Sequence, residues 1–127
     1  MSLELNVILG KVTVELQVDL AAQELKAIQT FTRRLEEQFG NRIISIILFG
    51  SRTRAEAQPD SDMDIAVIVD QDELELRKAI RYIAAEISLE HGFYLSTRVW
   101  SQAHWDQLAQ LQTGLYRNLL QDGIKVL

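Results

Sequence analysis

The sequence predicts an α+β fold, a small mixed β-sheet with flanking helices, and three observations indicate it. Residues 43–49 and 65–69 are short, mostly apolar runs of β-forming side chains, as expected for strands buried on both faces. Residues 21–39 and 72–90 carry apolar side chains at the spacing of an amphipathic helix. Because helices and strands intermingle along a chain of only 127 residues, we expect one sheet and one core.

The composition is that of an ordinary globular protein, with 47% apolar and 24% charged residues. The 13 basic and 18 acidic residues give a net charge of −5, which argues against direct binding of nucleic acid, because phosphates need neutralisation by Lys and Arg. The chain contains no cysteine, which excludes disulfides and thiolate chemistry. It has no apolar run long enough for a membrane span and no leader-like N-terminus, so we expect a cytoplasmic protein with no membrane contact.

Apolar and polar residues alternate over residues 3–18, interrupted by Gly10 and Lys11. A two-residue turn there pairs apolar residues of two strands on one face: Leu9 with Val12, Val7 with Val14, and Leu5 with Leu16. We therefore predict an N-terminal β-hairpin extension at residues 1–20 and the main domain at residues 21–127. A lone hairpin with one apolar face is marginal in water, so we expect it to pack on the domain, on a second copy in a homo-oligomer, or on a partner.

The helix predicted at residues 21–39 ends before Gly40, which acts as a stop signal. Its apolar positions recur on one side: Leu25, Ile28, Phe31, Leu35 and Phe39. The next helix is expected to be capped by Asp72 and to run to about Glu90, with Gly92 at its end. Its predicted inward positions are Leu76, Ile80, Ile83, Ala84 and Ile87.

Two further strands and two shorter helices complete the predicted fold. The alternation at residues 93–99 indicates a third strand, and Ser101 is expected to cap a helix that carries Trp105. A last helix at residues 114–121 and a short edge strand at residues 124–127 end the chain.

The segment of residues 50–64, between the first two predicted strands, is too polar for the core. Asp62 and Asp64 lie two positions apart at the start of the second strand, so their side chains project from one face, roughly 6–7 Å apart along the chain. Two carboxylates this close repel each other unless a divalent cation relieves the repulsion, and oxygen ligands suit Mg²⁺ or Mn²⁺. The pair is therefore a predicted metal site.

A phosphate cradle is predicted at Gly50 and Ser51, at the end of the first strand. Glycine permits a tight turn, and the following backbone N–H groups with the Ser51 hydroxyl can hold phosphate oxygens, while Arg52 and Arg54 add positive charge. Phosphoryl or nucleotidyl transfer requires such a cradle beside a metal. The alternative is an ordinary turn followed by solvated acids, and the position of the segment between two buried strands argues against it.

The spacing of Gly50-Ser51, ten further residues, and then Asp62 and Asp64 resembles the signature of the polymerase-β-like nucleotidyltransferase superfamily. The stretches LFGSRTR at residues 48–54 and SDMDIAV at residues 61–67 are similar to its minimal nucleotidyltransferase (MNT) branch. The resemblance covers most of the chain outside the hairpin.

The resemblance implies the polymerase-β-like nucleotidyltransferase fold and Mg²⁺-dependent adenylyl transfer from ATP, with Ser51 on the triphosphate and Asp62 and Asp64 on metal. Minimal domains of this family lack an acceptor-binding domain, and many are encoded beside a HEPN-domain ribonuclease toxin. Some transfer AMP to a tyrosine of that toxin and silence it. The resemblance therefore implies an antitoxin whose partner and AMP acceptor is a HEPN toxin.

The third strand departs from the family pattern. Active members usually carry a third carboxylate there, whereas residues 93–99 contain no acid and include Arg98; a family glycine is also replaced by Ala55. Two alternatives therefore stay open. One is an antitoxin that neutralises its partner by contact, with catalysis weak or lost. The other, less favoured, is a small-molecule nucleotidyltransferase, which usually needs a second domain.

Other residue types that often carry chemistry receive ordinary interpretations. His91 suits the carbonyl end of a helix, where a cationic ring is favoured. Trp100, Trp105 and Tyr116 are expected in the core rather than as platforms for stacking bases. Nothing in the sequence identifies a pocket for a nucleotide base.

Overall fold

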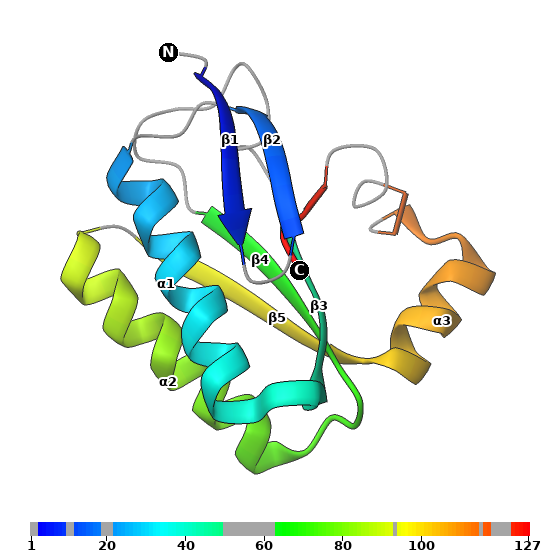
Figure 1. Ribbon diagram of the computed structural model, residues 1–127. Helices are drawn as coiled ribbons and strands as arrows, with labels where there is room; N and C mark the ends of the chain where they lie inside the picture. Colours follow the sequence, from blue (N-terminus) through cyan, green and yellow to red (C-terminus); the bar gives the residue numbers. More distant parts are fainter. Residues whose placement is uncertain are drawn as a thin grey trace.

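The computed structural model describes residues 3–9, 12–18, 22–49, 63–92, 94–114, 116–117 and 123–127. Within these residues the fold is α+β, with a four-stranded mixed sheet, helices on its two sides and an N-terminal hairpin (Figure 1). The fold class predicted from the sequence is therefore confirmed.

The hairpin consists of β1 (Leu3–Leu9) and β2 (Val12–Val18), which pair antiparallel in a two-stranded sheet of their own. Its register confirms the predicted pairs: Leu9 opposite Val12, Val7 opposite Val14, and Leu5 opposite Leu16. The turn residues Gly10 and Lys11 lie outside the described residues. The domain boundary at residue 20 stays a prediction.

The first helix, α1 (Ala22–Phe39), ends where the sequence predicts and is followed by a single 3₁₀ turn, η1 (Gly40–Arg42). Its inward side chains are fully buried: Ala27, Ile28, Phe31, Leu35, together with the polar Thr32. Gly40 has a φ of +55°, a left-handed conformation that only glycine adopts at little cost, so the chain leaves the helix at this residue.

The main sheet contains β3 (Ile43–Phe49), β4 (Met63–Val69), β5 (Leu95–Ser101) and β6 (Ile124–Lys125), in the order β5-β4-β3-β6. β4 pairs antiparallel with β3 and parallel with β5, and β6 pairs antiparallel with β3 at the edge. The predicted mixed sheet and C-terminal edge strand are thus confirmed.

Two strands differ in their bounds from the prediction. β4 begins two residues earlier than expected, because Met63 and Asp64 pair with Leu95 and Ser96 of β5. β5 begins later than residue 93 and continues to Ser101, because its parallel pairing with β4 runs as far as Val69. Pairing with a neighbour, rather than local alternation, sets both limits.

The second helix, α2 (Leu74–His91), has the buried positions that the sequence predicts: Leu76, Ile80, Ile83, Ala84 and Ile87. It ends at Gly92, whose φ of +74° lies in the left-handed region, as at Gly40. The prediction that Asp72 caps this helix is wrong, since Glu73 occupies the cap position and makes no side-chain cap bond.

Asp72, two residues before α2, instead pairs with Arg77 in the first turn of that helix. Nη2 of Arg77 donates to Oδ2 of Asp72 at 2.6 Å, and Nε donates to Oδ1 at 3.1 Å. These hydrogen bonds, aided by the opposite charge, raise the pKa of Arg77 above its ordinary value. Both oxygens of the Asp72 carboxylate thus bind the guanidinium of Arg77.

The short helix α3 (Gln102–Leu111) starts with the predicted cap, because Oγ of Ser101 accepts a hydrogen bond from the backbone N–H of His104 at 3.0 Å. Of the helix predicted at residues 114–121, Gly114 and residues 116–117 are helical. The other residues of that predicted helix lie outside the described residues. In the part of the chain that the structure describes, no helix is both long and apolar enough to cross a bilayer.

Helices α1 and α2 lie on one side of the sheet, and α3 lies on the other (Figure 1). α1 and α2 pack against alternate residues of β4, namely Ile65, Val67 and Val69, in the main core. Ala66 faces the other way and packs with Phe49 and the tryptophans beside α3. We call the side covered by α1 and α2 the closed face, and the side that carries Ala66 the open face.

Candidate active site

The strands that bound the predicted site segment lie next to each other. β3 ends at Phe49, and Phe49 pairs with Asp64 at the start of β4. The chain therefore leaves and re-enters the sheet at the same end. Of the predicted site residues, the following lie outside the described residues, so their roles stay predictions: Gly50, Ser51, Arg52, Arg54 and Asp62.

Asp64 is the predicted site residue that the structure places. It is half-buried on β4, between Phe49 on β3 and Ser96 on β5. Because side chains alternate along a strand, Asp64 projects from the same face as Ala66, two residues further on. The carboxylate therefore lies on the open face, away from the core beneath α1 and α2.

The third strand places a serine and an arginine beside this carboxylate. Ser96 is the parallel partner of Asp64, and Arg98 is the partner of Ala66. Paired residues of neighbouring strands share a face, so both side chains project from the open face with Asp64. The acid that the family pattern carries on this strand is absent from β5, and Ser96 occupies the position directly across from Asp64.

The charged side chain that shares the open face with Asp64 is the basic Arg98, whereas a site of three carboxylates would place an acid there. Arg98 is exposed and lies two residues along β5 from Ser96, in the next pair on the same face. A guanidinium is always charged and binds phosphate oxygens through several N–H groups, but it repels a cation. On this face Arg98 favours a polyphosphate and disfavours an isolated metal ion.

Of the two carboxylates predicted to bind metal, the structure describes Asp64. No group of three or more His, Cys, Asp or Glu side chains is close enough to hold an ion within the described ranges. Asp64 and Ser96 nevertheless present oxygen donors on one face, and oxygen donors are what Mg²⁺ prefers. This donor chemistry fits a magnesium ion.

Aromatic side chains gather further along the open face. The rings of Trp100 and Trp105 stack with centroids 6.1 Å apart, and Tyr116 meets Trp105 edge-on at 5.1 Å. All of these rings are half-buried. The expectation that they belong to the core is right for Trp100 and Trp105, which pack on Phe49 and Ala66, whereas Tyr116 contacts Trp105. It misses that Trp105 also lines a pocket, which no local sequence signal marks.

His91 lies in the last turn of α2, as the sequence predicts, with Nδ1 3.0 Å from the carbonyl oxygen of Ile87. Its position at the carbonyl end of a helix on the closed face suits the structural interpretation.

The fold and the position of Asp64 define a class: an α+β domain that presents a carboxylate on the open face of a mixed sheet, at the end where a polar segment joins β3 to β4. Comparison with known families identifies it. Residues 28–126 match the family model described as a nucleotidyltransferase domain. Because this match covers well over half of the chain, the protein belongs to that family, and its features are consistent with an MNT-type polymerase-β-like domain.

Two proteins of Methanocaldococcus jannaschii are similar to the chain. The protein named "Putative protein adenylyltransferase MJ0604" is 29% identical over 100 residues, which cover 79% of this chain and 94% of that protein. The protein named "Putative protein adenylyltransferase MJ1305" is 35% identical over 69 residues, which cover 52% of this chain and 47% of that protein.

Proposed function

We propose that this chain transfers AMP from ATP to a hydroxyl group of a partner protein in the cytoplasm, and that the partner is a HEPN-domain ribonuclease toxin for which it acts as the antitoxin. The observation that carries the proposal is the placement of Asp64 on the open face at the site end of the sheet. Membership of the nucleotidyltransferase family and similarity to two proteins named for protein adenylyl transfer support it.

In the proposed reaction, the hydroxyl oxygen of the acceptor forms a bond to the α-phosphorus of ATP. The bond from that phosphorus to the bridging oxygen breaks, pyrophosphate leaves with the electron pair, and the hydroxyl proton passes to solvent. A divalent cation, when bound, neutralises charge on the phosphate oxygens. Asp62 and Asp64 would hold it, while Ser51, Arg52 and Arg54 would hold the triphosphate.

The test is transfer of label to the partner. The full chain is incubated with Mg²⁺, ATP labelled at the α-phosphate, and the protein encoded by the adjacent gene. We expect label on the partner with α-labelled ATP and none with γ-labelled ATP, since only AMP is transferred. Absence of α-label from the wild-type reaction, at concentrations where the two proteins bind, contradicts the proposal.

Asp64→Asn should lower the transfer rate at least about a hundredfold, because it removes a charge that holds the metal where it stabilises the transition state. Asp62→Asn should do the same. Glu90→Gln, at an exposed position on α2, is the matched control and should transfer normally. Thermal unfolding of each variant separates lost chemistry from lost structure.

A second candidate function, neutralisation of the partner by contact alone, is favoured by one observation. Ser96, rather than an acid, lies opposite Asp64, and Arg98 shares that face. In that case the double variant Asp62→Asn/Asp64→Asn still neutralises the toxin in cells. Loss of neutralisation in the double variant would count against contact alone and favour catalysis.

We also propose that the hairpin joins copies of the chain or docks the partner. Its register places apolar residues opposite each other, with Val7 across from Val14. Val14→Glu in the full chain should then lower the molar mass measured by light scattering, or weaken partner binding. If neither changes, the hairpin serves neither purpose.

A further inference from the structure

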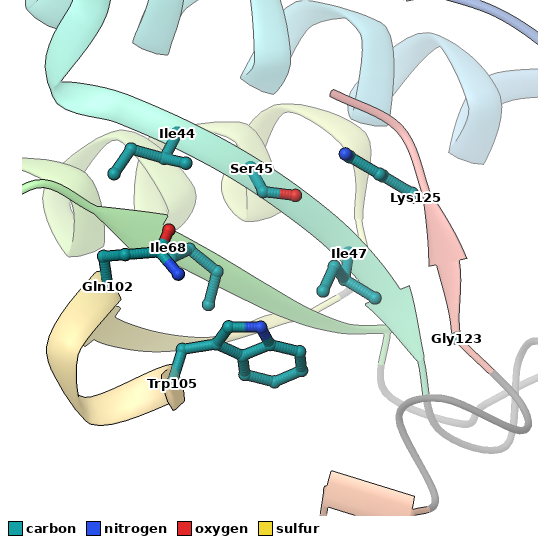
Figure 2. Close-up of a pocket in the computed structure, with 8 residues that line it drawn as sticks. All are labelled: Ile44, Ser45, Ile47, Ile68, Gln102, Trp105, Gly123 and Lys125. Atoms are coloured by element: carbon teal, nitrogen blue, oxygen red, sulfur yellow. The ribbon is translucent and has the colours of Figure 1, made fainter. Parts of the chain in front are cut away.

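A pocket of about 370 Å³ opens on the open face between the sheet and α3 (Figure 2). Its apolar surface comes from Ile44 and Ile47 on β3, Ile68 on β4 and Trp105 on α3. Its polar groups are Ser45, Gln102 and Lys125, contributed by β3, α3 and β6. Figure 2 shows the indole of Trp105 extending beneath the two strands toward Ile47.

We propose that this pocket binds the adenine base of the nucleotide whose triphosphate lies at the Asp64 end of the sheet. The inference rests on the proposed function, which already names ATP, and adds the position of the base and the residues that recognise it.

The size and lining of the pocket fit a small flat ligand. Sites for small molecules are concave, of about 300–1,000 Å³, mostly apolar, and carry a few convergent polar groups. This pocket has an apolar floor of isoleucines, one aromatic wall and three polar side chains. A nucleobase can bury its faces against the floor and the indole and present its polar edge to the rim.

Its position relative to Asp64 fits the length of a nucleoside. Ile47 pairs with Ala66, and Ser45 pairs with Ile68, on the strands that also carry Phe49 and Asp64. At about 3.3 Å per residue, the pocket begins about 7 Å along the strands from the level of Asp64 and ends about 13 Å away. Phe49, at the end of β3, is followed directly by Gly50 and Ser51, the predicted phosphate cradle. β3 therefore leads from the pocket to that cradle.

The polar groups favour adenine. Nε2 of Gln102 donates to Oδ1 of Asp106 at 2.9 Å, and a carboxylate only accepts, so this bond fixes the orientation of the amide. Oε1 of Gln102 can then accept from an exocyclic amine, while the ammonium of Lys125 can donate to a ring nitrogen. Guanine carries a carbonyl oxygen in place of that amine. This oxygen and Oε1 of Gln102 are both acceptors and cannot bond to each other, so guanine should bind more weakly.

The hydroxyl of Ser45 is held in place by a hydrogen bond within the protein. Its hydroxyl donates to the backbone carbonyl of Leu127 at 2.9 Å, which ties β3 to the C-terminal residues beside β6. The β3–β6 side of the pocket is thereby held in place before a ligand enters, and a preformed site loses less conformational entropy on binding.

The experiment compares two probes on the full chain with Mg²⁺: α,β-methylene-ATP, which cannot be cleaved at the reacting bond, and inorganic tripolyphosphate, which has no base. Calorimetry should show the ATP analogue binding at least about tenfold more tightly than tripolyphosphate. The protein has two tryptophans: Trp105 lines this pocket, and Trp100 stacks on Trp105. Their fluorescence should therefore change with the ATP analogue and not with tripolyphosphate.

Gln102→Leu should weaken binding of the ATP analogue about threefold to tenfold, the usual effect of losing one hydrogen bond, and leave tripolyphosphate binding unchanged. Gln107→Leu is the matched control, because it makes the same change at an exposed position of the same helix outside the pocket. Lys125→Met gives an independent second variant at an exposed residue of β6, should Gln102→Leu not fold.

The outcomes separate the two proposals. If neither probe binds, the nucleotide site itself is wrong and the base pocket falls with it. If both probes bind equally and the pocket variants change neither affinity, the base pocket is wrong while the triphosphate site stands. If the variants weaken binding of the partner protein alone, the pocket receives a partner side chain and the inference is overturned. An equal preference for the matching GTP analogue contradicts adenine.

Discussion

The two faces of the sheet share the same strands but carry different residues. On the closed face, two helices of 18 residues cover side chains that are almost entirely aliphatic and buried. On the open face, one described helix of 10 residues leaves Asp64, Ser96 and Arg98 in contact with solvent at the other end of the sheet. Alternation along each strand lets one strand serve both faces, so packing and chemistry are separated by one residue in sequence.

This separation has an energetic consequence. Residues of the closed face contribute to the free energy of folding through burial of apolar area, whereas the open-face polar residues contribute to binding. A substitution on one face should therefore leave the property carried by the other face largely intact. The ion pair between Arg34 and Glu86 joins α1 to α2, but both side chains are part-exposed, so packing rather than charge holds the helices together.

The largest expected effect is on the closed face. Phe31 on α1 is completely buried, and Phe31→Ala should lower the free energy of unfolding by about 3–5 kcal/mol, because it removes apolar contacts and leaves a cavity. Urea denaturation followed by circular dichroism measures the change. Leu89→Ala, at a residue that is 86% exposed on α2, is the control and should change stability by less than about 0.5 kcal/mol. An equal loss in both variants would contradict the closed core.

The next effect tests the open face at Ser96. Ser96→Asp places a carboxylate opposite Asp64 and should raise the affinity for Mn²⁺ at least about tenfold, because it adds a charged oxygen ligand. Isothermal titration with Mn²⁺ measures it, and AMP transfer should rise if the missing acid limits catalysis.

Thr97→Asp is the matched control for that change. Thr97 pairs with Ile65, so it projects from the closed face, one residue away from Ser96. The same added charge there should leave Mn²⁺ affinity unchanged. If both variants gain affinity equally, the effect comes from net charge and not from the geometry of the open face.

The smallest expected effect concerns the helix of the open face. Ser101→Ala removes the hydroxyl that accepts the N–H of His104 and should cost about 1 kcal/mol of stability. Because α3 carries Gln102 and Trp105, nucleotide affinity should fall slightly as well. Ser101→Asp retains a cap acceptor and should restore both properties; failure to restore stability would show that the cap is not the cause.

Local patterns in the sequence were sufficient for much of the fold. The limits of β3, the hairpin register and the inward side of α2 follow from spacing along the chain, and the structure confirms each. The sequence does not predict the role of Asp72 correctly, because helix capping and pairing with Arg77 compete for one carboxylate and the pairing prevails. The start of β5 differs from the sequence prediction because parallel pairing with β4 determines it.

The candidate site divides in the same way. Residue types and spacing in residues 50–64 predict the chemistry of phosphate and metal binding, and they place Asp64 at the start of a strand. They do not show that Ser96 lies across from it or that Arg98 shares its face, because those facts depend on the register between β4 and β5.

The sequence by itself determined the class of fold, the family and the kind of chemistry, because helix and strand periods and the spacing of Gly50, Ser51, Asp62 and Asp64 are short-range properties of one chain segment. Only the tertiary structure decided which face carries the acid, what stands opposite it, and where a pocket lies beside it. The pocket joins residues from β3, β4, α3 and β6, which are far apart in sequence and meet only when the sheet forms.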